Sequence, residues 1–176
     1  AQQAWAMPEQ EGSEAVNGQR SQPIVMAQTP GASVAIDEVR ADGPTESVTI
    51  VNHGQIDQPL AGWALVSLHG MEVFLFPEDT VLAAGQAVRV LSGEGAQVAG
   101  RADLLWTRDS VWSNRSDTVL LFDGLGHEVA RRTYPRPTVR QARVPKRKVL
   151  LRDRDGYHLV DWDDADPPAS QRESGL

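Results

Sequence analysis

The stretch "LAGWALVSL", residues 60–68, indicates a β-strand that is entered through a tight turn. Gly62 lets the backbone turn or approach another segment closely. Trp63 then carries the largest apolar side chain of the stretch into a core. The alternating positions are apolar on both sides, Trp63 and Leu65 on one and Ala64, Val66 and Leu68 on the other. We therefore expect a strand buried on both faces, well inside a sandwich.

A second apolar run, "MEVFLFP", residues 71–77, follows directly after His69-Gly70. Two apolar runs joined by a dipeptide that ends in glycine predict a β-hairpin with a two-residue loop. Pro77 ends the second strand because proline has no backbone N–H to donate to a ladder.

The remainder of residues 33–135 repeats this pattern of short apolar runs separated by turn signals. About eight strands are expected, with no helical periodicity between them, at 33–39, 47–52, 63–68, 71–77, 86–93, 102–106, 118–123 and 127–134. This spacing predicts an all-β fold, an immunoglobulin-like β-sandwich.

The two flanks differ from this region in composition. Residues 1–32 are rich in glutamine, with scattered glycine, serine and proline, and are interpreted as an extended arm. Residues 136–176 form a second arm, basic and then acidic. Within it, two strand-like runs meet at Asp155-Gly156, a turn signal, so a hairpin at 148–162 is expected.

Length and composition limit the class of protein. The chain has 176 residues, enough for one domain with tails, and no cysteine for a disulfide or a thiolate metal site. No stretch approaches the ~20 apolar residues of a membrane-spanning helix. The first residue is Ala1, which suits a mature chain after removal of a signal peptide, so we expect a secreted or envelope protein.

Charge is distributed unevenly along the chain. Residues 1–130 carry 6 Arg and no Lys against 17 acidic side chains, whereas residues 131–154 carry 8 Arg and 2 Lys against Asp153 alone. Residues 155–176 are acidic again. Only the basic ribbon 131–154 is therefore suited to neutralising a phosphate backbone.

No pattern indicates catalysis or a cofactor. The sequence contains no nucleophile elbow, no phosphate-binding glycine loop and no paired histidines at metal-ligand spacing. Each histidine stands alone at a turn or in the tail, at His53, His69, His127 and His158. We expect neither an enzyme nor a bound metal or cofactor.

One acidic run resembles a calcium loop. Asp153-x-Asp155-Gly156 is followed by further aspartates, but loop position 12, which holds glutamate in an EF-hand, falls on Asp164. A solvated turn with an acidic tail is the favoured interpretation, and calcium binding remains an alternative.

Further residues occur in an order that points to one family. The series contains Glu46, Val48, Ile50, Asn52, Leu60-x-Gly62-Trp63, Phe76-Pro77, Leu82-x-x-Gly85, Trp106, Val111-Trp112-x-Asn114-x-x-Asp117, Leu120, Asp123-x-x-Gly126, Val129 and Tyr134. In this order and spacing, residues 33–135 resemble the lamin-tail domain. The resemblance implies an immunoglobulin-like sandwich that acts as a binding or structural module without catalytic residues.

Bacterial and archaeal members are often exported or envelope-associated, and some are appended to nucleases or other hydrolases. They lack the coiled-coil rod of nuclear lamins, and neither flank here shows sustained heptads.

Most residues of this series have a structural interpretation. Four aromatic residues, Trp63, Phe76, Trp106 and Trp112, are expected in or over the core. A stacking platform for sugars or bases is the alternative, which requires rings exposed on one face. Gly62 serves the turn, and Asn52, Asn114 and Asp117 are expected to hydrogen-bond turn amides.

Two functions from different classes follow. The first is a structural or protein-interaction module whose arms bind partner proteins, through apolar anchors such as Ile24 and Val25 and through Arg143, Lys146, Arg147, Lys148, Val149, Leu151 and Trp162. The second is nucleic-acid or polyanion binding by residues 131–154. It is disfavoured because the acidic body competes for the ribbon and no aromatic residue lies between Tyr134 and Tyr157. A third, an accessory domain of a hydrolase or nuclease system, is not separable from the first by sequence.

Overall fold

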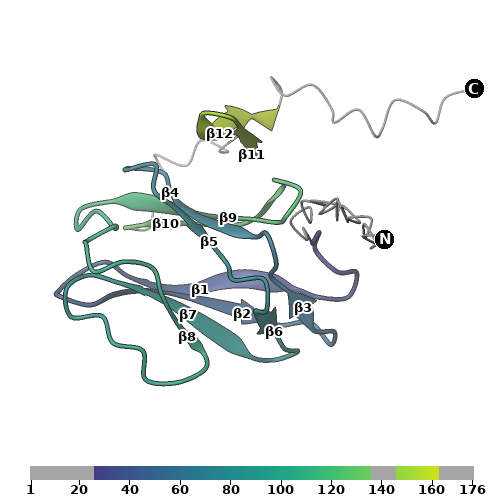
Figure 1. Cartoon of the computed structure of the whole chain (residues 1–176), viewed down its shortest axis with the longest axis horizontal. Coiled ribbons are helices and arrows are strands. Elements are labelled where there is room, and N and C mark those ends of the chain that lie inside the picture. Colours follow the sequence, from purple (N-terminus) through teal and green to yellow (C-terminus); the bar gives the residue numbers. More distant parts are fainter. Residues whose placement is uncertain (1–25, 136–145, 163–176) are drawn as a thin grey trace, which may run out of the picture.

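Two four-stranded sheets face each other in the computed structural model, which describes residues 26–135 and 146–162 (Figure 1). Sheet I has the order β1-β2-β7-β8. Its strands are β1 (Val34–Arg40), β2 (Glu46–Asn52), β7 (Ala87–Ser92) and β8 (Asp103–Leu105). Sheet II has the order β10-β9-β4-β5. Its strands are β4 (Ala64–Ser67), β5 (Val73–Leu75), β9 (Asp117–Phe122) and β10 (Glu128–Tyr134). No α-helix occurs among the described residues, so the predicted all-β sandwich is confirmed.

Neighbouring strands within each sheet are antiparallel except β7 and β8, which are parallel. A small additional sheet pairs β3 (Gln58–Pro59) with β6 (Val81–Leu82). The strand count therefore exceeds the expected eight. The sequence pattern treated residues 77–85 as a connection, because two-residue strands carry no alternation that a sequence can reveal.

The core lies between the two sheets. Trp63 and Leu65 point into it and are completely buried, together with Val48 and Ile50 of sheet I. The opposite side of the same strand presents Ala64 and Val66 to a second apolar cluster. The alternation read from residues 60–68 thus assigns each side chain to its observed layer.

Aromatic rings fill the side of the sandwich where β5 and β8 are the terminal strands. Phe74 lies 5.6 Å from Trp106 between ring centroids, and Trp106 lies 5.6 Å from Trp112 in an edge-to-face arrangement. Phe76 packs edge-to-face on Phe74 at 5.1 Å. Such pairs interlock and join the two sheets. They do not form the flat, exposed row that a stacking platform requires.

The loop between β4 and β5 corrects the prediction of a two-residue turn at His69-Gly70. The two strands are joined by residues 68–72, with Met71 in the left-handed region at φ 62°. The Met71 N–H donates to the Ser67 carbonyl over 2.9 Å, and the His69 N–H donates to the Asp117 carboxylate over 2.9 Å. Because a carboxylate from β9 binds the loop, the turn is wider than the local sequence indicates.

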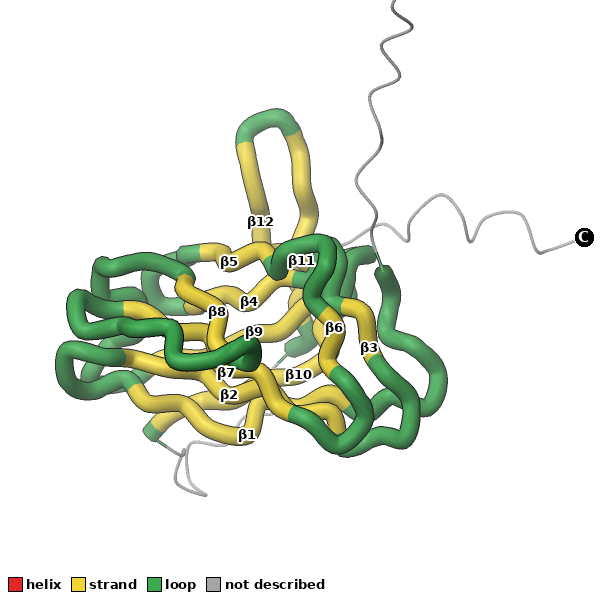
Figure 2. Tube along the Cα trace, turned by 60° about the horizontal axis from the view of Figure 1, so that its bottom comes forward, coloured by secondary structure: helices red, strands yellow, loops and turns green. Residues whose placement is uncertain are grey.

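A third layer covers the outer face of sheet II. It is the hairpin of β11 (Lys148–Asp153) and β12 (Gly156–Asp161), seen above β4 and β9 in Figure 1. Its Leu150 is buried in the second apolar cluster with Ala64, Val66, Leu120 and Phe122. The tip of the hairpin projects beyond the outline of the sandwich (Figure 2). Part of the expected C-terminal arm therefore completes the fold.

Candidate functional site

The hairpin is fixed to the sandwich at the turn between β9 and β10. The Leu150 N–H donates to the Gly126 carbonyl over 3.0 Å, and His127 forms an isolated β-bridge with Val149. Gly126 has φ +84°, and a Cβ at this position would collide with the carbonyl oxygen of Leu150. Only glycine combines this conformation with so close an approach of two backbones.

A charged clamp holds the start of β11. The Glu128 carboxylate accepts two hydrogen bonds from Arg131, at 2.7 and 2.8 Å, and a third from the Lys148 backbone N–H at 2.8 Å. Arg131 also donates to the Lys146 carbonyl over 2.9 Å. This bidentate pair is largely shielded from water, with the Arg131 and Glu128 side chains 17% and 9% exposed. Ion pairs with this geometry are among the stronger polar contacts in proteins.

The clamp forms one wall of a small cleft at the base of the hairpin. His127, Glu128, Arg147, Lys148 and Trp162 line a hollow of about 250 Å³. The backbone N–H of Trp162 donates to the Arg147 carbonyl over 2.9 Å, which brings the two ends of the hairpin together. The Trp162 indole lies 5.8 Å from the His127 ring and remains 49% exposed. We call this hollow the Trp162 cleft.

The electrostatic field around the cleft is positive. Lys148 Nζ donates to Asp161 over 2.6 Å, and this bond holds the pKa of the Asp161 carboxyl below its ordinary value. The charges of Lys148, Lys146 and Arg131 lower that pKa further. Arg147 is exposed, and its guanidinium makes no ion pair with any described residue. A carboxylate brought to this surface would be stabilised in the same way as Asp161.

The structure gathers only some of the residues predicted to bind a partner. Arg147, Lys148 and Trp162 share the cleft, Leu151 is exposed on the hairpin, and Val149 is buried against the sandwich. Arg143 lies outside the described residues. His127 and Glu128 are not among the predicted partner-binding residues, and Arg131 was predicted only as part of the basic ribbon 131–154. The spacing of Glu128 and Arg131 carried no signal, because residues three apart on a regular strand face opposite sides of the sheet. The register shift between Glu128 and Ala130 is what allows Glu128 and Arg131 to meet.

The model of the Lamin Tail Domain family matches residues 27–136. This match spans more than half of the chain. The chain belongs to the lamin tail domain family. No curated protein matches it. The resemblance drawn from the ordered motif residues is thereby confirmed, and the observed sandwich is that of an immunoglobulin-like module.

Three buried polar residues brace the loops of this lamin tail domain. Asn52 accepts from the Ser33 and Gly54 N–H groups and donates to the Ile56 and Leu82 carbonyls. Glu46 accepts from the Ser92 hydroxyl at 2.7 Å and from the Val111 N–H at 2.8 Å. Asp117 accepts from the Ser67 hydroxyl over 2.7 Å. Their hydrogen bonds are satisfied internally, which makes them structural.

The remaining motif residues of the lamin tail domain are also structural. Gly62 has φ +77° and precedes Trp63, whose indole N–H donates to the Met26 carbonyl over 2.7 Å. Phe76 and Trp112 are buried. Asn114 is exposed, and the turn amides of Arg115 and Ser116 donate instead to the Ser113 hydroxyl, both over 3.4 Å.

Tyr134 closes the same end of the lamin tail domain. Its hydroxyl donates to the Ser113 carbonyl over 3.0 Å. Burial raises the pKa of this hydroxyl, and the charges of Asp117 and Glu46 raise it further. Tyr134 is therefore a neutral hydrogen-bond donor at any physiological pH.

Within residues 26–135 and 146–162, no group of three or more histidine or acidic side chains is placed to hold a metal ion. At the proposed calcium turn, the Asp153 carboxylate accepts from the Asp155 N–H over 2.8 Å and contacts His158. Asp163, Asp164 and Asp166 lie outside the described residues. In the described part of the chain, no helix is long and apolar enough to cross a membrane.

Proposed function

We propose that this lamin tail domain is a non-catalytic protein-interaction module that binds an acidic segment of a partner protein at the Trp162 cleft. The observation that carries the proposal is a half-exposed tryptophan beside a guanidinium without an ion pair to any described residue. Both groups stand on a hairpin that is fixed to a rigid sandwich by Glu128 and Gly126.

Tryptophan and arginine are the residue types that most often dominate binding energy at protein interfaces. Trp162 has a wall on one side, the His127 ring at 5.8 Å, and is open on the other. An apolar side chain of a partner that covers the open face would remove the indole from water. Because the backbone of Trp162 is already bonded to Arg147, little ordering is required on binding.

Charge selects the class of partner. The cleft and its rim carry Arg131, Lys146, Arg147 and Lys148 against two carboxylates, Glu128 and Asp161. This excess favours an acidic peptide over a basic one. A nucleic acid is the alternative, since arginine binds phosphate equally well. Two cations of the region already pair with the domain's own carboxylates, Arg131 with Glu128 and Lys148 with Asp161. Because these cations bind carboxylates here, the protein partner is favoured over a phosphate backbone.

Selection from a random peptide library displayed on phage tests the proposal with the whole chain as bait. We expect enrichment of acidic peptides that contain an apolar residue. Trp162→Ala is expected to lower the affinity for a selected peptide by about 30-fold, which corresponds to roughly 2 kcal/mol of binding free energy. Leu105→Ala is the matched control, because Leu105 is 40% exposed on sheet I. Equal affinities of the two variants would contradict the proposal.

Titration with DNA and RNA at two salt concentrations distinguishes the alternative. The substitutions Arg143→Ser, Lys146→Ser, Arg147→Ser and Lys148→Ser are combined in one variant. We expect weak binding of nucleic acid by the natural chain. Tight binding at physiological salt, with a steep salt dependence that this variant flattens, would replace the protein partner with a polyanion.

We also propose that the protein is exported or associated with the cell envelope. This proposal rests on the resemblance to lamin-tail proteins of bacteria and archaea, many of which are exported or envelope-associated. An accessory role beside a hydrolase or nuclease fits the same surface, because such a role also requires a docking module. Fractionation of native cells tests the location. Recovery of the protein solely in the cytosolic fraction would overturn it.

A further inference from the structure

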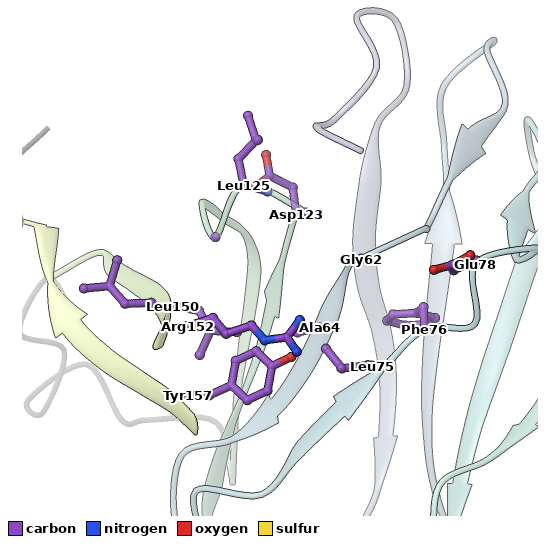
Figure 3. Close-up of a pocket in the computed structure, with 13 residues that line it drawn as sticks. Gly62, Ala64, Leu75, Phe76, Glu78, Asp123, Leu125, Leu150, Arg152 and Tyr157 are labelled. Atoms are coloured by element: carbon purple, nitrogen blue, oxygen red, sulfur yellow. The ribbon is translucent and has the colours of Figure 1, made fainter. Parts of the chain in front are cut away.

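A second hollow lies on the other side of the hairpin, between the hairpin and the edge of sheet II (Figure 3). It has a volume of about 400 Å³. Its floor contains Gly62 and Ala64, and its walls contain Leu75 of β5, Leu125 of the β9–β10 turn, and Leu150 and Tyr157 of the hairpin. Figure 3 shows Arg152 and Tyr157 reaching from the hairpin toward Leu75. We call this hollow the β5 groove.

The groove combines exposed leucines with three charged side chains of its lining, Glu78, Asp123 and Arg152. Leu75, Leu125 and Leu151, all of which line it, are 44%, 56% and 45% exposed. Covering these leucines, which come from three different elements around the hollow, would stabilise the domain, because removing apolar area from water is favourable. The small residues of the floor leave room for a backbone to lie across it.

The described chain begins at the end of this groove. Met26 N–H donates to the Ala61 carbonyl over 3.0 Å, and the Gly124 N–H donates to the Met26 carbonyl over 2.8 Å. Ala61 directly precedes Gly62 of the groove floor, and Gly124 belongs to the groove wall. Met26 therefore lies across the entrance, bonded to both sides.

The direction of the chain leads into the groove. Thr29 bonds to Gln58, and Met26 bonds to Ala61, so residues 26–29 run antiparallel to residues 58–61. A segment continued backward from Met26 along this line would next pass Gly62 and then Ala64, both of which line the groove.

We propose that residues 22–25 of the same chain, Gln-Pro-Ile-Val, bind in the β5 groove as an extended segment, with Ile24 and Val25 covering its leucines. The composition suits this role, because Pro23 favours an extended backbone and the two following residues are apolar and β-branched. The inference concerns a surface separate from the Trp162 cleft and does not depend on binding there.

Disulfide trapping in the full chain tests this inference directly, because the natural chain has no cysteine. The pair Ile24→Cys with Leu75→Cys is compared with the pair Ile24→Cys with Val98→Cys. Val98 is a matched control, since it is 53% exposed and does not line the groove. Under mild oxidation, we expect the first pair to close an intramolecular disulfide at least about tenfold faster, because a bound segment has a high effective concentration.

Two results would overturn the inference. Closing rates that are equal for both pairs would mean that the segment does not bind the groove. A first pair that yields covalent dimers, at a rate rising with protein concentration, would assign the groove to a second copy of the chain. Nuclear Overhauser contacts between the Ile24 methyl groups and the Tyr157 ring give an independent readout in the unsubstituted protein. Their absence would also count against the inference.

Discussion

The sandwich and the hairpin are held by different means. In the sandwich, sixteen buried apolar residues, from the strands of both sheets and from the segments that connect them, form one core. The hairpin buries only two side chains, Val149 and Leu150, with Tyr157 and Leu159 partly covered beside the cluster on sheet II. Its attachment also includes a few polar bonds around Gly126 and Glu128. Stability that is spread over a core makes the sandwich fold or unfold as a unit. A local attachment allows the hairpin to open while the sandwich stays folded.

The largest effect is expected from removing the central side chain of the sandwich. Trp63→Ala should lower the free energy of unfolding by about 3–5 kcal/mol, because it empties a large cavity in the core. Chemical denaturation measures this loss. Trp162→Ala is the control, with an expected change below about 0.5 kcal/mol, since that indole is half-exposed. A similar loss in both variants would erase the distinction between the two regions.

The next effect concerns the apolar contact of the hairpin. Leu150→Ala should weaken the attachment of β11 and β12 by about 2–4 kcal/mol, while the sandwich keeps most of its stability. Hydrogen exchange of the hairpin amides measures the attachment separately from global unfolding. Leu151→Ala, at the neighbouring exposed position, should change it by less than about 0.5 kcal/mol. If Leu150→Ala destabilised the sandwich amides equally, the hairpin would be part of the same cooperative unit.

A smaller effect is expected at the turn that receives the hairpin. Gly126→Ala adds a Cβ that collides with the Leu150 carbonyl and should weaken the attachment by about 1–3 kcal/mol. Gly43→Ala is the matched control, because Gly43 has a similar φ of +86° with open space around it. Both variants force an alanine into a positive φ, but only the Cβ of Gly126→Ala collides with the backbone of the hairpin. Hairpin exchange that responds equally to both would exclude the close approach as the cause.

Acid provides the mildest perturbation. Lys148 and Asp161 are cross-strand partners within the hairpin, and their bond lowers the pKa of the Asp161 carboxyl, so the ionised carboxylate favours the paired strands of the hairpin. This contribution is present above the unfolded pKa near 3.9 and is lost as the pH falls through the lower folded value. Protection of the hairpin amides should therefore decline below about pH 4. Asp161→Asn should flatten the decline, and an unchanged pH profile in this variant would show that another group is responsible.

The sandwich was predictable from the sequence because its strands alternate on a two-residue period and its turns carry glycine and asparagine. The strand that follows Gly62 is apolar on both faces, with Trp63 and Leu65 on one and Ala64 and Val66 on the other. The sequence therefore also indicated that some other segment packs on the face of Ala64 and Val66. The sequence did not show which segment supplies that cover, because Leu150 is distant along the chain and its run is short. The Trp162 cleft was only partly predictable for the same reason. Arg147, Lys148 and Trp162 stand out in the sequence, but His127 joins them only through the docking of the hairpin.

Amide hydrogen exchange at single-residue resolution on the full chain tests most directly whether the hairpin belongs to the folded body and builds the cleft. The decisive signal is the Leu150 N–H, which is bonded to the Gly126 carbonyl. We predict that it exchanges at least about a hundredfold more slowly than an unstructured amide, which corresponds to roughly 2.7 kcal/mol of protection. A Leu150 amide that exchanges as fast as an unstructured peptide, beside fully protected amides in β9, would contradict the account.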